Sequence, residues 1–338
     1  MNKDLFKRIS LGYVPSEPVK EKEKLDELFQ YKDYLYDIHF AHYDKREIMS
    51  GRDINVSKEN VLNFVEQGIE KYGFNLTLLM NNIPKGFPLD KVVEVFKEVY
   101  YPRGVRNVVI ADINLIRKIR DSFPDVLIQG SCLSYRLTAE ELEEERIAGV
   151  SLHNPRMEII RDVKNLKRNS ELGYRQKVLW SEGCLKYCPF EPIHREALYV
   201  GRPLEKDCKD FIKQDPFYFL SASWITVERL KELIDYIDVI KLSRGANNYK
   251  NVEYPTTKIL EAFIQIYEND LEYDVLMFAR NNYASYVRRC VGGVPSSLFK
   301  DGFFDLIEDC GRRCEELNCR RCNDIMEKLY TQRSDSNV

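Results

Sequence analysis

The sequence predicts an α/β protein, a (β/α)8 TIM-like barrel with a cysteine-rich C-terminal extension. Short apolar runs alternate with amphipathic helical stretches along most of the chain. Most of these runs are almost continuously apolar, as expected of parallel strands that are buried on both faces. Four cysteines also crowd into a short segment near the C-terminus. A doubly wound open sheet is the alternative, but no Gly-x-Gly-x-x-Gly motif follows any expected strand.

The apolar runs place eight strands along the chain. In order, they are Ser10–Val14, Leu35–Phe40, Asn75–Met80, Asn107–Asp112, Val126–Gly130, Gly149–His153, Lys177–Glu182 and Ile237–Leu242. The connection from Gly183 to Tyr236 is long, so we expect an elaborated loop over the barrel mouth, with Phe217–Leu220 as a further strand candidate.

Helical patterns lie between the expected strands. The clearest are Asn60–Lys71, Leu89–Val99 and Thr138–Arg146, and the last opens with Thr138-Ala-Glu-Glu141, the pattern of a capping box. The elements predict a barrel with a cluster-binding loop, then a cysteine-rich metal-binding extension, then a disordered tail. These parts span residues 1–300 with the loop at 183–236, residues 301–330, and residues 331–338.

Composition indicates an ordinary globular protein. Charged residues make up 31% and hydrophobic residues 44% of the chain, and the net charge of −3 gives no general reason to expect nucleic-acid binding. The N-terminus lacks the apolar run of a signal peptide, and no stretch approaches the ~18 apolar residues of a membrane span. We therefore expect a cytoplasmic location, where clustered cysteines indicate metal ligands or catalytic thiols rather than disulfides.

The first cysteine group is Cys184, Cys188 and Cys208. Three thiolates can hold three corners of a four-iron cluster and leave the fourth iron for another ligand or for substrate. Cys132 follows the fifth expected strand and is the best candidate for the fourth ligand. The alternative is that Cys132 is a small buried residue.

The second group is Cys310, Cys314, Cys319 and Cys322, four cysteines within thirteen residues. Zinc and iron–sulfur both fit four thiolates, and only one Cys-x2-Cys spacing is present, which favours a second 4Fe-4S cluster over zinc. The Cys-x3-Cys-x2-Cys spacing of radical S-adenosylmethionine enzymes is absent. Radical chemistry therefore remains only an alternative.

The four histidines of the chain all follow or end expected strands. They are His39, His42, His153 and His194. In a TIM barrel the active site is built at the carboxyl ends of the strands, so this distribution favours a functional cleft there. The alternative for each histidine is a hydrogen-bonded polar group near the surface.

Part of the chain resembles a known family. The segment Trp180–His194 resembles the Glu-x-Cys-Leu-x-x-Cys-Pro-x-x-x-x-His segment of the U32 collagenase-like peptidase group, and Ser223–Glu228 and Ile237–Arg244 resemble its later conserved segments. The resemblance spans about residues 105 to 322 and implies a barrel with an oxygen-sensitive iron–sulfur cluster. It also implies oxygen-independent hydroxylation of ubiquinone precursors or RNA bases. Val227 and Ser243 depart from the proline and glycine of that pattern.

The resemblance also implies roles for individual residues. Cys184, Cys188 and Cys208 become cluster ligands, while Lys241 and Arg244 follow the last strand, where TIM barrels often bind phosphate. The expected catalytic residues are His153, His194, Glu182 and Lys241. The residues expected to bind cofactor or substrate are Arg244, His39 and Asp112.

The sequence therefore predicts an iron–sulfur redox enzyme that modifies a small organic or RNA-borne substrate, with two 4Fe-4S clusters or with zinc at the C-terminal site. We expect an electron donor such as ferredoxin or flavodoxin, a possible protein partner subunit, and no membrane association. The alternatives are a metal-dependent peptidase or hydrolase, a non-standard radical S-adenosylmethionine enzyme, and a cluster-bearing accessory subunit.

Overall fold

The computed structural model describes most of the chain up to Leu242 and several later segments. The described residues are 3–50, 56–84, 86–185, 220, 222–242, 256–278, 287–288, 292–300, 302–307, 322, 324–325 and 327. The chain forms two compact units. The first comprises Met1–Ile159, Lys164–Leu179 and Ile234–Arg244, and the second comprises Ile160–Val163, Trp180–Leu233 and Gly245–Val338.

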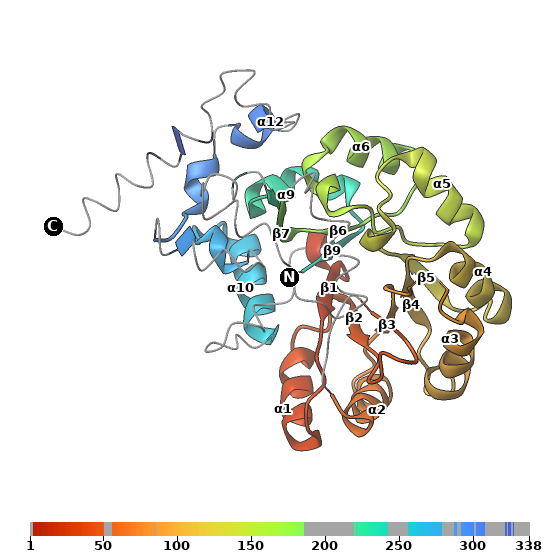
Figure 1. The fold of residues 1–338 in the computed structure, drawn as a ribbon. Coiled ribbons are helices and arrows are strands. Elements are labelled where there is room, and N and C mark those ends of the chain that lie inside the picture. The colour runs from red at the N-terminus through yellow and green to blue at the C-terminus, as the bar shows by residue number, and fades with distance from the viewer. Residues whose placement is uncertain are drawn as a thin grey trace. The chain divides into compact units, whose positions relative to one another are not determined.

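A seven-stranded parallel sheet forms the centre of the first unit (Figure 1). Its order is β5-β4-β3-β2-β1-β9-β6. The strands are β1 (Ile9–Gly12), β2 (Leu35–Ala41), β3 (Leu76–Met80), β4 (Asn107–Ile110), β5 (Leu127–Gly130), β6 (Lys177–Leu179) and β9 (Val239–Lys241). Almost every residue of these strands is buried, which confirms the prediction of a parallel α/β sheet drawn from the apolar runs.

The two edge strands of this sheet are joined through one short segment. Gln129 of β5 forms a parallel bridge with Leu152, and His153 forms one with Gln176 just before β6. The Gly130 N–H donates to the Leu152 carbonyl at 2.9 Å on one side. On the other side, the backbone N–H that opens β6 donates to the His153 carbonyl at 2.7 Å. The hydrogen-bonded ring thus returns to its first strand, an arrangement compatible with the predicted TIM-like barrel.

The predicted sixth strand is much shorter than expected. It was expected over Gly149–His153, but only its last two residues form bridges. Gly149 instead ends the preceding helix, with φ of +111° in the left-handed region that glycine adopts easily. Because the helix cap takes the first part of the segment, two residues remain to pair with both neighbours.

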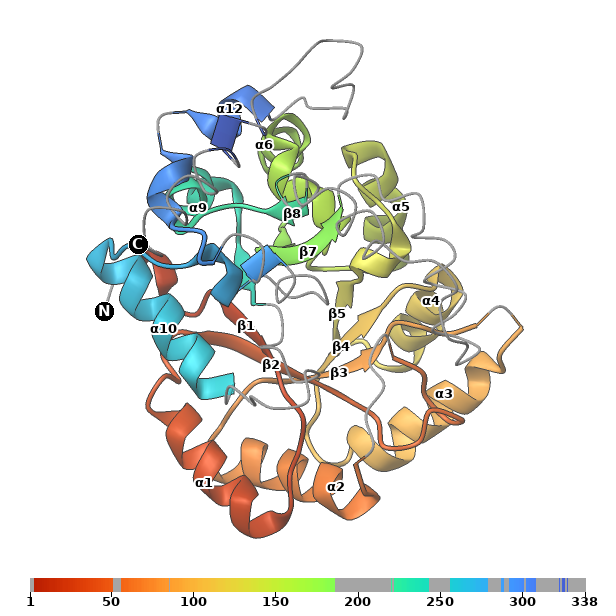
Figure 2. The ribbon, with the colours of Figure 1, turned by 60° about the vertical axis from the view of Figure 1, so that its left-hand side comes forward.

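Helices follow the strands in sequence. Figures 1 and 2 show α1 to α5 on the outside of the strands of the same unit. They are α1 (Pro18–Phe29), α2 (Lys58–Glu66) continued by a π-helical turn (Gln67–Lys71), α3 (Leu89–Val95) continued by another (Phe96–Tyr100), α4 (Ile113–Ser122), α5 (Ala139–Ala148) and α6 (Val163–Glu171). Among these described helices, none combines the length and the hydropathy that a bilayer-spanning segment requires.

The predicted capping box is confirmed at the start of α5. The Thr138 hydroxyl accepts a hydrogen bond from the Glu141 N–H at 3.4 Å, and the Glu141 carboxylate accepts one from the Thr138 N–H at 3.0 Å. These two bonds satisfy backbone donors that the first turn of a helix leaves open. They also fix the start of the helix that carries Glu145 toward the sheet.

The predicted seventh strand, Lys177–Glu182, is divided between the two units. β6 ends at Leu179, and Ser181–Leu185 forms a separate strand, β7, antiparallel to β8 (Ala222–Trp224). Trp180 packs in the second unit against Phe263 and Phe278, with ring centroids 4.8 and 4.9 Å apart. Burial of this large ring among other aromatic rings draws the chain out of the parallel sheet.

The second unit contains five further described elements. They are α9 (Val227–Leu233), α10 (Thr256–Asn269), the 3-10 turns η8 (Val275–Met277) and η9 (Ser296–Phe299), and α12 (Phe303–Ile307). Of the further strand expected at Phe217–Leu220, only Leu220 lies within the described residues, and the strand β8 begins at Ala222. The Arg161 guanidinium donates to the carbonyls of Leu220 and Ala222 at 2.9 and 2.6 Å and so fixes this strand.

Candidate functional site

Polar side chains from several strands meet in the interior of the barrel-like ring. Asp37 on β2 contacts Gln129 on β5 and Lys177 on β6, although none of these strands is a neighbour of another in the sheet. Side chains of such distant strands can meet only across the enclosed space, so all three point inward. Since side chains alternate along a strand, this assigns the inward positions of each strand.

These three residues and Thr77 form a closed cluster, which we call the interior network: Asp37, Thr77, Gln129 and Lys177. The Lys177 ammonium donates to both carboxylate oxygens of Asp37, at 3.0 and 2.9 Å, and to Gln129 Oε1 at 2.8 Å. Gln129 Nε2 and Thr77 Oγ1 each donate to Asp37 Oδ2 at 2.8 Å. All four side chains are buried.

The interior network stabilises the charged form of Asp37. Burial alone raises the pKa of this carboxyl, but the charge of Lys177 and hydrogen bonds from Ser10, Gln129 and Lys177 outweigh it and hold the pKa below its usual range. Every hydrogen of the Lys177 ammonium is used by the three bonds described above. The network therefore links four strands, β2, β3, β5 and β6, rather than offering a reactive group.

A second set of inward positions lies two residues further along the strands. Val109 is in register with Gln129, and Gln129 with Leu152, so counting two residues on gives Ala111, Ser131 and Asn154. The same count along β3 gives Asn81, whose Nδ2 donates to Ser131 Oγ at 3.2 Å. We call Asn81, Ala111, Ser131 and Asn154 the upper row. It lies at the carboxyl edge of the sheet, where barrel enzymes bind substrate.

The upper row holds a buried amide for which the described residues provide no hydrogen-bond partner. Asn154 is 2% exposed, and among the residues that the structure describes neither its Nδ2 nor its Oδ1 has a hydrogen-bond partner. Asn82 lies at the same edge after β3, and its Oδ1 likewise has no partner in the described part of the chain. Because buried amides are normally hydrogen-bonded, these two residues are the candidates for contact with a ligand at this edge.

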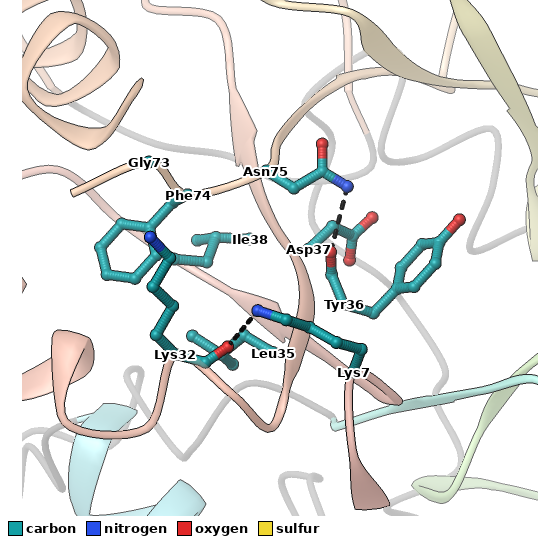
Figure 3. Close-up of a pocket in the computed structure, with 9 residues that line it drawn as sticks. All are labelled: Lys7, Lys32, Leu35, Tyr36, Asp37, Ile38, Gly73, Phe74 and Asn75. Carbon is teal, nitrogen blue, oxygen red and sulfur yellow. Dashed lines mark hydrogen bonds between the residues drawn. The ribbon is translucent and has the colours of Figure 1, made fainter. Parts of the chain in front are cut away.

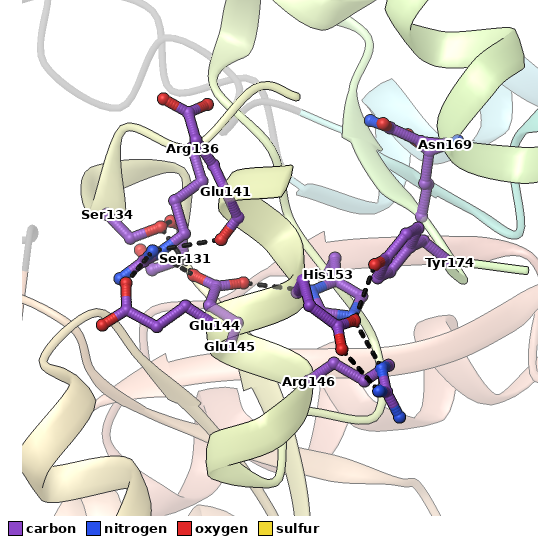
Figure 4. A network of polar contacts seen from close by, with 12 residues as sticks. Ser131, Ser134, Arg136, Glu141, Glu144, Glu145, Arg146, His153, Asn169 and Tyr174 are labelled. Atoms are coloured by element: carbon purple, nitrogen blue, oxygen red, sulfur yellow. Dashed lines mark hydrogen bonds and ion pairs between the residues drawn. The ribbon is translucent and has the colours of Figure 1, made fainter. Parts of the chain in front are cut away.

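The structure places His39 and His153 on opposite faces of the sheet. His39 points inward, is fully buried, and has Nδ1 3.3 Å from Ser10 Oγ. His153 points outward to α5, with Nδ1 3.1 Å from Glu145 Oε2 and its ring against Tyr174 (Figure 4). Both lie near carboxyl ends of strands as predicted, but the structure does not bring them together.

The carboxylate of Glu145 is the centre of the polar contacts around His153 (Figure 4). Ser134 Oγ donates to Glu145 Oε1 at 2.8 Å, and Arg136 Nε lies 3.2 Å from the same oxygen as an ion-pair contact without hydrogen-bond geometry. β5 ends in Gly130 because a Cβ there would lie 2.6 Å from Glu145 Oε2. The buried carboxylate therefore ties α5 to the turn that follows β5.

Cys132 begins that turn, a 3-10 turn over Cys132–Ser134. The Ser131 hydroxyl caps it by accepting from the Leu133 N–H at 3.2 Å, and Tyr135 ends it with φ of +62°. A non-glycine residue in this left-handed region costs about 1–2 kcal/mol, which the surrounding hydrogen bonds offset. The Cys132 side chain is half-buried, at the carboxyl edge predicted for it.

Two other predicted residues have clear positions. Asp112 caps α4, since its Oδ1 accepts from the Asn114 and Leu115 N–H groups at 2.9 Å each. Lys241 is 8% exposed and is in register with Ser10, so its side chain points inward near the end of β9.

The remaining predicted site residues are not described in their side chains. Only the backbone of Glu182 and Cys184 is described, in β7. Cys322 is partly exposed in a short helical segment. The others lie outside the described residues: Cys188, Cys208, Cys310, Cys314, Cys319, His194 and Arg244. In the part of the chain that is described, no three His, Cys, Asp or Glu side chains are grouped as metal ligands.

His42, another of the four histidines, directly follows β2 and lies in a buried contact with Tyr100 and Glu47. Its Nδ1 is 2.6 Å from the Tyr100 hydroxyl and its Nε2 is 3.0 Å from Glu47 Oε2. Burial lowers the pKa of His42, although Glu47 opposes this, and burial raises the pKa of Tyr100. A neutral imidazole that accepts from Tyr100 and donates to Glu47 fits both shifts.

A cavity of about 150 Å³ lies at the opposite, amino-terminal end of β2 and β3 (Figure 3). Its polar groups are engaged with the backbone. Lys7 Nζ donates to the Lys32 carbonyl at 2.8 Å, and Asn75 Nδ2 donates to the Tyr36 carbonyl at 3.0 Å. This end of a barrel usually contributes to stability rather than catalysis, so the upper row remains the better candidate site.

Comparisons with known proteins identify no family. No protein-family profile matches the chain, and no curated protein matches it. Among solved structures, it is similar to a U32 peptidase, with 14% identity, a TM-score of 0.47, and coverage of 69% of this chain and 91% of that one. It is also similar to a glycerophosphodiester phosphodiesterase from Parabacteroides distasonis, with 11% identity, a TM-score of 0.43, and coverage of 76% and 98%.

A third similar structure is described as native KDPGal, with 13% identity, a TM-score of 0.39, and coverage of 77% of this chain and 93% of that one. At TM-scores below 0.5, none of these likenesses assigns an activity to the chain.

Sequence reasoning overlooked both inward sets of polar residues. Asp37 and Lys177 are charged residues of opposite sign within otherwise apolar runs, and a buried strand accepts such residues only when they are paired. That signal was available in the sequence. Asn154 carried no comparable signal, because asparagine after a strand is equally typical of an ordinary turn.

Proposed function

We propose that this protein is an iron–sulfur-dependent redox enzyme that binds its substrate at the upper row. The reaction is an oxygen-independent hydroxylation or a related modification of a small organic or RNA-borne substrate. The supporting observation is that Ser131 and Cys132 are consecutive. Ser131 belongs to the inward upper row, and the half-buried thiol of Cys132 begins the turn directly after it.

In this proposal, Cys184, Cys188 and Cys208 hold a cluster with Cys132 as the fourth ligand or as a neighbour of the open iron. The cluster supplies electron transfer and a Lewis-acidic iron when it is bound. Cys132 fits this role in being partly accessible and in lying on a turn fixed by hydrogen bonds.

The protein side chains supply binding and orientation. Lys241 points inward with a positive charge and would hold an anionic group of the substrate. The amides of the upper row would orient the remainder of the substrate. The C-terminal group Cys310, Cys314, Cys319 and Cys322 would hold a second cluster that relays electrons from a donor such as ferredoxin or flavodoxin, or a structural zinc.

Metal and acid-labile sulfide analysis of protein purified without oxygen tests this proposal. Two clusters require about eight iron and eight sulfide per chain, and one cluster requires about four of each. The variant Cys184→Ala should lose about four iron, while the matched control Cys290→Ala, outside both groups, should keep all of them. Zinc without iron would favour the hydrolase alternative, and protein without any metal would overturn the proposal.

A further inference from the structure

Asn154 stands out among the inward polar residues because it is buried and yet neither atom of its amide has a partner in the part of the chain that the structure describes. In the interior network every hydrogen of Lys177 and both oxygens of Asp37 are used. Asn154 is 2% exposed, and neither atom of its amide is hydrogen-bonded within the described residues. Burying both amide atoms without hydrogen bonds costs free energy, and a ligand that bonds to them would remove this cost.

The register fixes where this amide points. Leu152 is in register with the inward Gln129, and His153 points outward to Glu145, so the next side chain, Asn154, points inward. The same register places Asn154 between Ser131 on the β5 side and Lys177 on the β6 side. Ala111, in the same row, has only a methyl group and offers no hydrogen-bonding partner to the amide.

The chemistry of the amide selects its ligand. Nδ2 is a donor and Oδ1 is an acceptor, and the two lie side by side in one plane. A carboxylate would be repelled by Oδ1, and an ammonium group would leave Nδ2 without an acceptor. The complement is a neutral planar group with a donor beside an acceptor, as in the cis-amide of a lactam or in a primary amide.

We propose that Asn154 is the recognition residue of a ligand site at the carboxyl edge, and that it binds a lactam or primary amide through two parallel hydrogen bonds. The proposal rests on the proposed function only in treating this edge as the place where substrate binds. It requires neither a cluster nor any particular reaction.

A pair of probes tests the recognition. δ-Valerolactam offers a donor beside an acceptor, whereas its N-methyl derivative keeps the ring and the acceptor but carries a methyl group in place of the donor hydrogen. The full-length protein is titrated with each probe, and binding is followed by saturation-transfer NMR. We expect the lactam to bind roughly tenfold more tightly, the effect of one lost hydrogen bond of about 1.4 kcal/mol. Equal binding of the two probes, or no binding of either, would overturn the proposal.

Two leucine variants separate recognition from a structural role. Asn154→Leu should abolish the preference for the lactam and leave the Tm unchanged or raised, since it removes an unsatisfied buried amide. The matched control is Asn169→Leu, because Asn169 is also buried but its Nδ2 donates to the Leu137 carbonyl at 3.0 Å and to Gln176 Oε1 at 3.2 Å. The Asn169→Leu variant should have a lower Tm than the wild type and should still prefer the lactam to its N-methyl derivative.

If Asn154→Leu lowers the Tm as much as the control does, Asn154 is structural and the proposal is wrong. Iron content measured on the same Asn154→Leu preparation keeps the two proposals apart. We expect it to equal that of the wild type. Protein without iron that still prefers the lactam would contradict only the proposed function, and iron-loaded protein without the preference would contradict only this inference.

Discussion

The interior network and the upper row lie on neighbouring levels of the same ring of strands, yet they differ in how their polar groups are satisfied. Asp37, Gln129 and Lys177 bond to one another and leave no charge without a partner. Two residues further along the strands, Asn154 is just as buried and bonds to nothing in the described part of the chain. A polar residue in a core is therefore informative only when its partners are counted.

The largest effect should come from breaking the interior network on one side. Lys177→Met leaves the Asp37 carboxylate buried without its counter-charge, so we expect the free energy of unfolding to fall by about 3–5 kcal/mol. Chemical denaturation measures this. The double variant Asp37→Leu with Lys177→Met leaves no charge behind and should lose less. A double variant that is less stable than the single one would contradict the account of the network as a compensated ion pair.

Substituting Glu145 measures how much the polar cluster outside the ring contributes to stability, for comparison with the interior network. Glu145→Gln weakens the contacts to His153, Ser134 and Arg136, and we expect a loss of about 1–3 kcal/mol in the free energy of unfolding. Ser134→Ala, which removes one of these contacts, is the smaller matched change. If His153 is catalytic, as the sequence predicts, His153→Ala should abolish activity even in the fraction of protein that remains folded, beyond the loss of stability that follows from removing its contact with Glu145.

Low pH should reduce the contribution of the interior network to stability and leave that of the upper row unchanged. The pKa of Asp37 is lowered in the folded state, so its contribution is fully present above the unfolded pKa of about 3.9 and is lost as pH falls through the folded pKa. Within that window the free energy of unfolding should fall by up to about 1.4 kcal/mol per pH unit. Asp37→Asn should flatten this dependence, whereas Asn154→Leu should leave it unchanged, and denaturation at stepped pH distinguishes them.

Removing the capping box should cause the smallest loss of stability, and this loss is a reference for the other variants. Thr138→Ala removes one side-chain bond at the exposed start of α5, so we expect a loss of about 1 kcal/mol. Thermal unfolding measured beside Glu145→Gln shows how much of the stability of α5 comes from its buried carboxylate. Equal losses would mean that the Glu145 cluster contributes no more than a helix cap.

The order of strands and helices was predictable from the sequence because apolar runs and helical patterns alternate regularly. All eight expected segments take part in the ring, although Leu152 and His153 alone remain of the sixth. The division after Leu179 was not predictable, since the apolar run continues without a break into Trp180. It is the packing of that ring in the second unit that ends the strand.

The faces of the strands were harder to predict than their positions. A strand that is buried on both sides shows no alternation of apolar and polar residues. The sequence therefore did not indicate that His39 points inward and His153 outward. The carboxyl-edge position of Cys132 was predictable because it depends only on where β5 ends. Whether it contacts the first cysteine group remains a prediction.

The two-residue pairing at Leu152 and His153 makes this position a seam in an otherwise well-paired ring. β2 and β3 are joined along four consecutive residue pairs, whereas the seam depends on single bridges on each side. Local opening requires fewer broken hydrogen bonds at the seam, so the amide hydrogens of Gly130 and Lys177 should exchange with solvent sooner than those within β3. Asn154 directly follows the seam, so we expect transient separation of the strands at this position to expose the buried amide to solvent.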